Sequence, residues 1–335
     1  MEAAQNKQAK PAGLDTLLNL VSDDLKKVNA LIMDYMQSDV VLIPQLAGHL
    51  IAAGGKRLRP LLTLAASQLC DYRGERHLGL AACIEFIHTA TLLHDDVVDE
   101  SDLRRGRATA NAIFGNKPSV LVGDFLFSRS FQLMSVDGSL EVIEALSSAS
   151  AIIAEGEVQQ LMIQNDLDTT LESYLEVISG KTAVLFAAAS RLGAIVAERP
   201  EAEKDALSSY GQNLGVAFQL VDDILDYSAK QAELGKTIGD DFREGKMTLP
   251  VLICIRNAEE EEQAFWQRTV GDLEQTDSDL EKALELMKKY NALEESMQMA
   301  RDYVSKAIDD LAIFPDSTAK TALIEAVEFS VAREF

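Results

Sequence analysis

The sequence has few residues that would divide it into separate parts. Seven prolines are spread over 335 residues, which leaves few places for a linker between domains. Hydrophobic residues make up 47% of the chain and charged residues 25%, and the mean hydropathy is near zero. This composition is typical of a soluble globular protein that buries a sizeable core, and it excludes an intrinsically disordered chain. We therefore expect residues 14–335 to form a single large domain.

Cysteine is also scarce. The three cysteines, Cys70, Cys83 and Cys254, are an odd number and none of them forms a CxxC pair, so neither a disulfide framework nor a zinc site is indicated. His88 and His94 are six residues apart, which is not the spacing of a zinc-binding pair on a helix. A reducing compartment suits this cysteine content, and we expect a cytoplasmic protein.

Long apolar runs are absent as well. No run approaches the ~20 residues that are needed to cross a bilayer, so we expect no stable membrane insertion. The first residues, MEAAQNKQAKPAG, lack the basic start and the apolar stretch of a signal peptide. We expect residues 1–13 to be a disordered tip.

Basic residues are in the minority. Lys and Arg number 31 against 54 Asp and Glu, so the formal net charge is −23. This charge opposes binding to nucleic acid and to anionic lipid surfaces, because both attract concentrated Lys and Arg. We expect no nucleic-acid partner, and any anionic ligand must be met by a local cluster of basic residues.

The sequence is instead rich in helical periodicity. From Leu14 to Tyr35, apolar residues recur at steps of three and four, which places them on one face of a helix. No alternating strand pattern lies between turn residues. We predict an all-α fold, a single large helical bundle around a central cavity. Further helices are expected at residues 78–100, 119–134, 140–163, 171–197, 203–228 and 249–258, and over most of the remainder.

Two acidic clusters lie within this helical pattern. LLHDDVVDE contains Asp95, Asp96 and Asp99, and QLVDDILDY, about 130 residues later, contains Asp222, Asp223 and Asp226. On a helix, carboxylates four residues apart project from one face about 5–6 Å apart and repel each other. Mg²⁺ would relieve this repulsion, since it binds one or two carboxylates together with water and phosphate. An exposed acidic patch would explain one such cluster, but two copies in apolar surroundings favour a metal site.

The basic residues gather close to the acidic clusters. They lie in GGKRLRP (Lys56, Arg57, Arg59), directly after the first cluster (Arg104, Arg105, Arg107), and singly at Lys181, Lys236 and Lys246. Arginine binds phosphate oxygens with two parallel hydrogen bonds, and lysine acts as a point charge. Carboxylates that hold magnesium beside these cations describe a diphosphate site. For GGKRLRP alone, a basic helix end before Pro60 is an equally good explanation.

Two other phosphate and metal motifs are excluded. The sequence contains GKT twice, but a P-loop requires a further glycine five residues before the glycine of that motif. Leu175 and Lys230 stand at these positions. A calcium-binding EF-hand is excluded because its glycine-bearing loop is missing.

Together these segments resemble the trans-isoprenyl diphosphate synthases, and in particular the long-chain polyprenyl members. The similarity runs from about Leu46 to Pro250 through GGKRLRP, IHTATLLHDDVVDESDLRRGRATAN, VGDFLFSR, GEVQQL, GKTAVLF, FQLVDDILDY and GKTIGDDFREGKMTLP, in the family's order. The resemblance implies the all-α isoprenoid synthase fold and a homodimer. It also implies a prenyltransferase that adds isopentenyl diphosphate repeatedly to an allylic diphosphate, such as farnesyl diphosphate, with two or three Mg²⁺ ions.

The resemblance also assigns residues to roles. The catalytic aspartates would be Asp95, Asp96, Asp99, Asp222, Asp223 and Asp226, with metal held by Asp95, Asp99 and Asp222. Isopentenyl diphosphate would be bound by Lys56, Arg59, His88 and Arg105. The allylic diphosphate would be bound by Arg104, Lys181, Thr182, Gln219, Lys236 and Lys246. Magnesium and these cations would stabilise the leaving diphosphate, so that the allylic C–O bond can ionise and the isopentenyl double bond can attack.

The residues one turn before Asp95 predict the length of the product. Ala90 and Thr91 lie about 5.4 Å deeper along the helix, where short-chain members of the family carry aromatic residues as a floor. Both are small here, so the growing chain can continue past Ile87 and Ile84. We expect octaprenyl to decaprenyl diphosphate, for the ubiquinone side chain. A large aromatic residue such as Phe86 or Phe127 would stop the chain earlier.

Several alternatives remain. A terpene cyclase would carry an Asn/Ser/Glu metal motif in place of DDILD and would lack GGKRLRP, and a head-to-head prenyl coupler would carry DxxxD motifs. A shorter-chain geranylgeranyl synthase and a non-catalytic subunit of a hetero-oligomer stay open, although both aspartate clusters are complete. Transient membrane contact for product release also stays open, although no basic amphipathic helix supports it.

Overall fold

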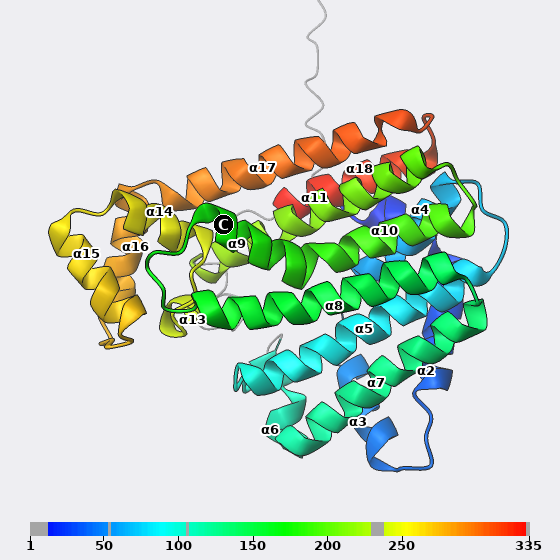
Figure 1. The fold of residues 1–335 in the computed structure, drawn as a ribbon, viewed down its shortest axis with the longest axis horizontal. Coiled ribbons are helices and arrows are strands. Elements are labelled where there is room, and N and C mark those ends of the chain that lie inside the picture. The colour runs from blue at the N-terminus through cyan, green and yellow to red at the C-terminus, as the bar shows by residue number, and fades with distance from the viewer. Residues whose placement is uncertain (1–12, 53–54, 105–106, 229–237, 333–335) are drawn as a thin grey trace, which may run out of the picture.

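A computed structural model of the chain describes residues 13–52, 55–104, 107–228 and 238–332, and Figure 1 shows its fold. The predicted tip therefore lies outside the described residues apart from Gly13. The structure is 78% helical with almost no strand, and the prediction of an all-α fold is confirmed.

The helices fill most of the described ranges. In chain order they are α1 (Asp15–Leu20), α2 (Ser22–Tyr35), α3 (Leu42–Ala52), α4 (Leu58–Leu69), α5 (Arg76–Val98), α6 (Ala110–Phe114), α7 (Asn116–Asp137), α8 (Leu140–Ile163), α9 (Leu171–Ile178), η1 (Ser179–Ala183), α10 (Val184–Val196), α11 (Glu201–Asp226), α13 (Asp240–Arg243), α14 (Leu249–Asn257), α15 (Glu260–Trp266), η2 (Gln267–Gly271), α16 (Asp279–Lys289), α17 (Ala292–Asp310), η3 (Leu311–Ile313) and α18 (Thr318–Val331).

The observed boundaries agree with most of the predicted helices and correct three of them. The helix expected at residues 140–163 is α8. The one expected from Leu14 to Tyr35 is divided at Val21 into α1 and α2. The one expected at 171–197 is divided by a π-helical turn, and the one expected at 78–100 ends at Val98. A two-residue hairpin was not expected: β1 (Leu103–Arg104) pairs antiparallel with β2 (Arg107–Ala108).

The connection between α7 and α8 illustrates how short turns fix the bundle. Gly138 ends α7 in the left-handed conformation, with φ +73°, which glycine adopts without strain. Ser139 then begins α8, because its hydroxyl accepts a hydrogen bond from the backbone N–H of Val142 at 3.4 Å. Such a short connection makes the two helices antiparallel neighbours.

The larger of two hydrophobic cores holds the first acidic helix. It joins the apolar faces of α4, α5, α7, α8 and α10, with α11 and α18 closing it. Nearly every residue of α4 from Pro60 to Leu69 is buried in it. Figure 1 shows α5, α7 and α8 running side by side below α10 and α11.

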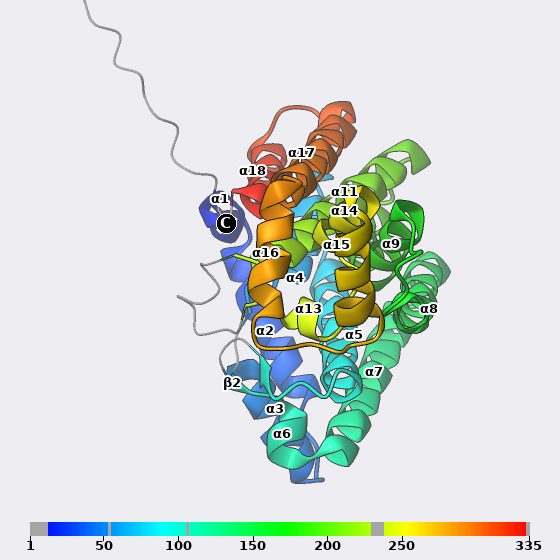
Figure 2. The same cartoon turned by 90° about the vertical axis from the view of Figure 1, so that its left-hand side faces the viewer.

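A second core lies at one end of the molecule. It joins α9 and the last turns of α11 with α13, α14, α15, α16 and α17, around the fully buried Trp266. Figure 2 shows α13 to α16 in front of the main bundle at this end. Helix α11 contributes to both cores, with Leu214 and Ala217 in the larger and Leu220 and Ile224 in the smaller. That residues 14–335 form a single domain stays a prediction.

Candidate active site

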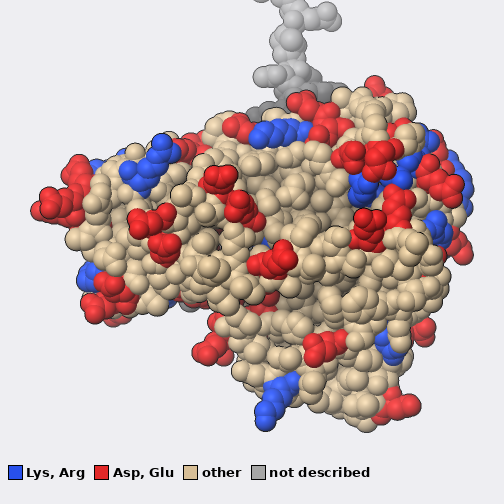
Figure 3. Space-filling view, viewed as in Figure 1, with Lys and Arg blue, Asp and Glu red and all other residues tan. Residues whose placement is uncertain are grey.

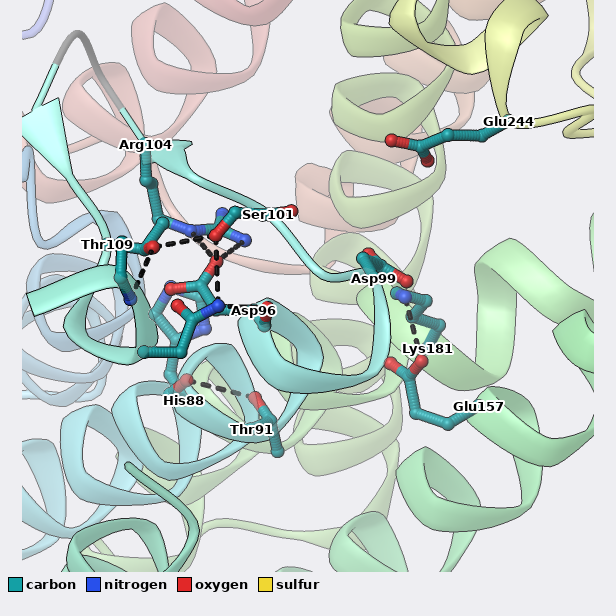
Figure 4. A network of polar contacts seen from close by, with 12 residues as sticks. His88, Thr91, Asp96, Asp99, Ser101, Arg104, Thr109, Glu157, Lys181 and Glu244 are labelled. Atoms are coloured by element: carbon teal, nitrogen blue, oxygen red, sulfur yellow. Dashed lines mark hydrogen bonds and ion pairs between the residues drawn. The ribbon is translucent and has the colours of Figure 1, made fainter. Parts of the chain in front are cut away.

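The first acidic cluster lies at the C-terminal end of α5. Asp95 is in the last turn, and Asp99 caps the helix, with its backbone N–H donating to the carbonyl oxygen of Asp95 at 2.8 Å. Asp96 is buried and points away from Asp99, toward Arg104, as Figure 4 shows. Its Oδ1 accepts hydrogen bonds from the Arg104 guanidinium, at 2.7 Å from Nε. The two carboxylates of the predicted metal pair are therefore Asp95, on the helix, and Asp99, at its end.

Side chains hold the segment that follows α5. Asn111 Nδ2 donates to the carbonyl oxygens of Asp96 and Ser101, each at 3.0 Å. Thr109 Oγ1 donates to the same Ser101 carbonyl at 2.6 Å. The β1–β2 pairing places Arg104 within this network. The network fixes the end of α5 and hence the direction in which its carboxylates project.

The second acidic cluster lies at the C-terminal end of α11. Both carboxylate oxygens of Asp223 have donors: Tyr174 Oη donates to Oδ2 at 2.6 Å, and Gln219 Nε2 donates to Oδ1 at 2.8 Å. Asp226 Oδ2 accepts from the backbone N–H of Asp241 at 3.0 Å. A further acid, Asp241, is thereby brought to the cluster.

Negative charge is poorly balanced in both clusters. Burial raises the pKa of Asp95 to about 7. Burial, together with the charge of Asp241, raises the pKa of Asp223 to about 8 and that of Asp226 to about 7. The pKa of Asp241 is also raised, mainly by burial. A divalent cation such as Mg²⁺ would stabilise the ionised form of these buried carboxylates, so the donor set fits such an ion.

The chain by itself does not form a closed metal cage in the part that the structure describes. Within these ranges, no three His, Cys, Asp or Glu side chains are grouped closely enough to hold a metal ion. This agrees with the usual way in which Mg²⁺ is bound, through one or two carboxylates, with water and substrate phosphate as the other ligands.

Lys246 lies between Asp99 of the first cluster and Asp241. Its Nζ lies 4.0 Å from Asp99 Oδ2 and 3.5 Å from Asp241 Oδ1, and it forms its shortest ion pair with Glu244 Oε2 at 2.6 Å. Asp99 belongs to the end of α5, and Asp241 is bonded to the end of α11 through Asp226. Two segments that are far apart in the sequence therefore meet at one lysine.

Lys181 and Thr182 lie in the π-helical turn η1. Lys181 Nζ donates to Glu157 Oε2 at 2.7 Å, and Thr182 Oγ1 donates to Gln219 Oε1 at 2.9 Å. In Figure 4, Lys181 and Glu157 lie beside Asp99. Gly156 allows α8 this close approach, because a Cβ at that residue would lie 2.8 Å from the backbone nitrogen of Lys181. Single π-helical turns within α-helices are frequent at functional sites.

Arg59 on α4 and His88 on α5 face each other. Arg59 Nη1 lies 3.1 Å from His88 Nε2, and its guanidinium stacks 4.1 Å from the centroid of the Phe186 ring. Burial lowers the pKa of Arg59 to about 10, while the charge of Asp222 opposes this shift. The contact joins two of the residues expected to bind isopentenyl diphosphate. Arg59 also interacts electrostatically with Asp222 of the second cluster.

The remaining predicted residues are distributed as follows. Lys56 is exposed, with Nζ 4.3 Å from the centroid of the Phe329 ring. Arg105 and Lys236 lie outside the described residues, so their roles stay predictions. The proposed floor residues line up on α5: Ala90 and Ile87 are fully buried, and Thr91 is half-buried, with Oγ1 donating to the carbonyl oxygen of His88 at 2.9 Å.

Three residues that contact this network were given no role by the sequence. Glu157 and Asp241 lie in GEVQQL and GKTIGDDFREGKMTLP, two of the segments that carry the family resemblance, and that was the available signal. Tyr174 lies in none of these segments. A tyrosine among apolar residues on a helix has the pattern of a core residue, so no signal marked its hydroxyl.

An all-α bundle with aspartate clusters at the ends of two long helices, and with lysines beside these ends, has the architecture of enzymes that bind prenyl diphosphates. The family model described as polyprenyl synthetase matches residues 40–287, and the chain belongs to this family. It is 48% identical to the octaprenyl diphosphate synthase of Escherichia coli over 321 residues, which are 96% of this chain and 99% of that protein.

Solved structures agree with this assignment. A polyprenyl synthase from Caulobacter crescentus, complexed with calcium and isoprenyl diphosphate, has a TM-score of 0.93 and 52% identity, covering 97% of this chain and 99% of that one. A decaprenyl diphosphate synthase from Rhodobacter capsulatus has a TM-score of 0.93 and 52% identity, covering 96% and 99%. The predicted isoprenoid synthase fold is confirmed.

Proposed function

We propose that this member of the polyprenyl synthetase family is a long-chain all-trans polyprenyl diphosphate synthase. It condenses isopentenyl diphosphate repeatedly onto an allylic diphosphate and makes octaprenyl to decaprenyl diphosphate for the side chain of ubiquinone. The observation that carries this proposal is that Asp99, at the end of α5, and Asp241, which is bonded to the end of α11, meet at Lys246. Similarity to an octaprenyl diphosphate synthase over nearly the whole chain supports it.

The metal ligands in this proposal are Asp95, Asp99 and Asp222, which hold two or three Mg²⁺ ions together with the diphosphate. The donor set suits Mg²⁺, since all three ligands are carboxylates and Asp95 ionises reluctantly without a cation. The bound metal supplies positive charge that stabilises the departing diphosphate.

The chain's own cations supply further charge for the leaving group. Lys181 and Lys246, which lie beside Asp99, bind the allylic diphosphate, with Thr182, Gln219, Arg104 and Lys236 assisting. Fixed cations stabilise charge as it develops on the diphosphate oxygens, and they do so without reorganisation. Arg59, His88, Lys56 and Arg105 bind isopentenyl diphosphate. Buried apolar residues of α5, such as Ile87, keep water from the allylic cation.

Turnover by the purified chain tests the proposal. The chain is incubated with Mg²⁺, farnesyl diphosphate and isopentenyl diphosphate, and the dephosphorylated product is separated by chromatography. We expect a product of roughly forty to fifty carbons, and a loss of at least about 100-fold in turnover for Asp95→Asn and for Asp222→Asn. A twenty-carbon product would instead indicate a geranylgeranyl synthase. No turnover by the chain alone would indicate a non-catalytic subunit.

Product length is proposed to be limited along α5. Ala90→Phe places a ring beside Ile87, one turn below Asp95, and the product should become shorter by several isoprene units. The same chromatography measures this change. An unchanged length in an active, folded Ala90→Phe enzyme would place the floor elsewhere, for example at Phe86 or Phe127.

We also propose that the chain forms a homodimer through the outer face of α7 and α8. Large apolar side chains are exposed along this face, among them Phe131, Val136, Leu140, Val158, Leu161 and Met162. Figure 3 shows that the surface over these helices is largely free of charge. Two chains that each carry a net charge of −23 repel each other where charged faces meet. Contact between two copies is therefore favoured at this apolar face.

We propose a cytoplasmic localisation for the enzyme. Cys70, Cys83 and Cys254 are free and buried, as expected in a reducing compartment. None of the helices in the described ranges is long and apolar enough to span a membrane. Release of so apolar a product is proposed to involve transient membrane contact.

A further inference from the structure

The end of α8 is bonded to the loop that carries Lys246. Directly after the helix, Gln164 Nε2 donates to the carbonyl oxygen of Glu244 at 2.7 Å. The backbone N–H of Asn165 donates to the carbonyl oxygen of Gly245 at 3.0 Å. The two peptide groups before Lys246 are therefore both held from α8.

The two partners in this contact are closely fitted. Gly245 has φ +67°, and a Cβ at that residue would lie 1.9 Å from Asn165 Nδ2. Asn165 itself has φ +64°, and its Nδ2 donates to the carbonyl oxygen of Val270 at 2.7 Å. Only glycine fits at residue 245 without displacing Asn165, so the contact needs this pair of residues.

The same helix also holds the second lysine of the allylic site. Glu157, whose Oε2 accepts the hydrogen bond from Lys181 at 2.7 Å, lies seven residues before Gln164 on α8. Seven residues of α-helix span about 10.5 Å. Helix α8 therefore sets the positions of Lys181 through a side chain and of Lys246 through the backbone of its loop.

We propose that Gln164 and Asn165 are positioning residues, which hold the Glu244–Lys246 loop so that the Lys246 ammonium stays between Asp99 and Asp241. This proposal rests on the function proposed above, in which Lys246 binds the allylic diphosphate. Neither residue touches substrate. They act by keeping the ammonium within reach of the diphosphate before it arrives, which lowers the cost of ordering the loop on binding.

The test is a change in substrate affinity that is confined to one substrate. Gln164→Met keeps the length and the helix propensity of the side chain and removes its donor. We expect the KM for farnesyl diphosphate to rise about threefold to tenfold, the KM for isopentenyl diphosphate to stay unchanged, and the melting temperature to stay near that of the parent. Gln159→Met is the matched control, because Gln159 lies on α8 and bonds to Glu176 instead of the loop.

A double-mutant cycle separates positioning from a general structural effect. In the Lys246→Met background, Gln164→Met should cause no further rise in the KM for farnesyl diphosphate, because the ammonium that the loop positions is gone. Additive effects, equal rises for both substrates, or an unchanged KM in Gln164→Met would overturn the positioning role. If Lys246→Met alone leaves the KM for farnesyl diphosphate unchanged, the proposed role of Lys246 fails, and the positioning role fails with it.

Discussion

At the scale of single residues, adjacent aspartates in each cluster have different environments. Successive residues on an α-helix project about 100° apart, so the second aspartate of each DD pair cannot face the same way as the first. Asp96 accordingly turns to Arg104, and Asp223 is bonded to Tyr174 and Gln219. Both are buried and bonded to protein donors, Asp223 through both carboxylate oxygens, so we expect them to support the cluster rather than to contact a metal.

Removing the Tyr174 hydroxyl should weaken catalysis through Asp223. In Tyr174→Phe, one carboxylate oxygen of Asp223 loses its donor, and we expect turnover at saturating substrate to fall about threefold to tenfold. Steady-state kinetics over a range of Mg²⁺ concentrations measures this, and the Mg²⁺ requirement should rise.

Tyr210→Phe controls for the loss of a buried hydroxyl. Tyr210 Oη donates to the carbonyl oxygen of Leu323 at 2.8 Å in the larger core, away from both clusters. Both variants should lose similar stability, about 1 kcal/mol, but only Tyr174→Phe should lose activity. Equal activity in the two variants would show that Asp223 does not need this donor.

The sequence predicted which residues are acidic and how they are spaced, but not the partners that orient them. The i, i+4 spacing of Asp95 and Asp99 is visible in the chain. The contact of Asp223 with Tyr174 joins residues 49 positions apart, and no local pattern encodes it. Similarly, the bond between Asp241 and Asp226 joins residues 15 positions apart, and helical periodicity does not predict it.

At the scale of secondary structure elements, the helix expected at residues 171–197 is divided at the site itself. Periodicity predicts one helix there because apolar residues recur on both sides of SGKTA. The π-helical turn shifts the register by one residue within that segment, and windows of ten or more residues do not detect such a shift. The sequence did not predict the hairpin of β1 and β2 for a related reason, since strands of two residues are too short to show an alternation of apolar and polar residues.

Close helix packing makes one glycine sensitive to substitution. A Cβ at Gly193 on α10 would lie 2.5 Å from both the Ala66 Cβ and the Ser67 backbone nitrogen on α4. Gly193→Ala should lower the free energy of unfolding by about 1–3 kcal/mol, because the two buried helices must separate. Denaturant unfolding measures the change.

Gly48 provides the matched control on another helix. It is exposed on α3, and a Cβ there would meet nothing within 4 Å. Gly48→Ala should therefore be neutral or stabilise by about 0.5–1 kcal/mol, since alanine is the better helix former. If the two variants behaved alike, the close approach of α10 to α4 would not limit the residue size at Gly193.

The start of α16 should make stability depend on pH. Hydrogen bonds from Arg268 hold the pKa of Asp279 well below its usual range, and Thr276 adds to this. Because this pKa is lower in the folded than in the unfolded chain, the contribution is present above the unfolded pKa of about 4 and is lost as the pH falls below it. Asp279→Asn should lower the melting temperature at pH 7, and the difference from the parent should shrink toward pH 3.

The control for this pH dependence is the exposed Asp277, two residues earlier. Asp277→Asn should leave the melting temperature and its pH profile nearly unchanged. A constant difference between Asp279→Asn and the parent from pH 7 to pH 3 would show that ionisation of Asp279 is not the cause.

At the scale of the whole molecule, helical periodicity predicted the class of fold, and the family resemblance predicted which helices come together. No physical argument from the sequence brings QLVDDILDY to LLHDDVVDE, since many arrangements of amphipathic helices bury the same faces. The second core, around Trp266, lies mostly beyond Pro250, where the resemblance ends. For this part of the chain, the sequence predicted further helices but not the core that they form.

The proposed dimer is tested by one charge on the apolar face. The parent should sediment with the mass of two 36.6 kDa chains, and Val158→Glu, at a residue that is 60% exposed on α8, should shift it toward one. Burying an unpaired carboxylate in an apolar contact is costly. Ile313→Glu, 51% exposed on η3, should leave the mass unchanged. A monomeric parent would exclude the dimer, and a Val158→Glu dimer would place the contact on another face.

Helix α11 spans both cores, and this has a consequence for how the molecule responds to its ligands. Its earlier turns are buried in the larger core, whereas its last turns belong to the second core, at the end that carries Lys246. The like charges of the aspartates at the C-terminal ends of α5 and α11 repel each other. A magnesium diphosphate that joins these aspartates would replace that repulsion with attraction, so the loaded enzyme should unfold as one cooperative unit at a higher temperature than the empty one.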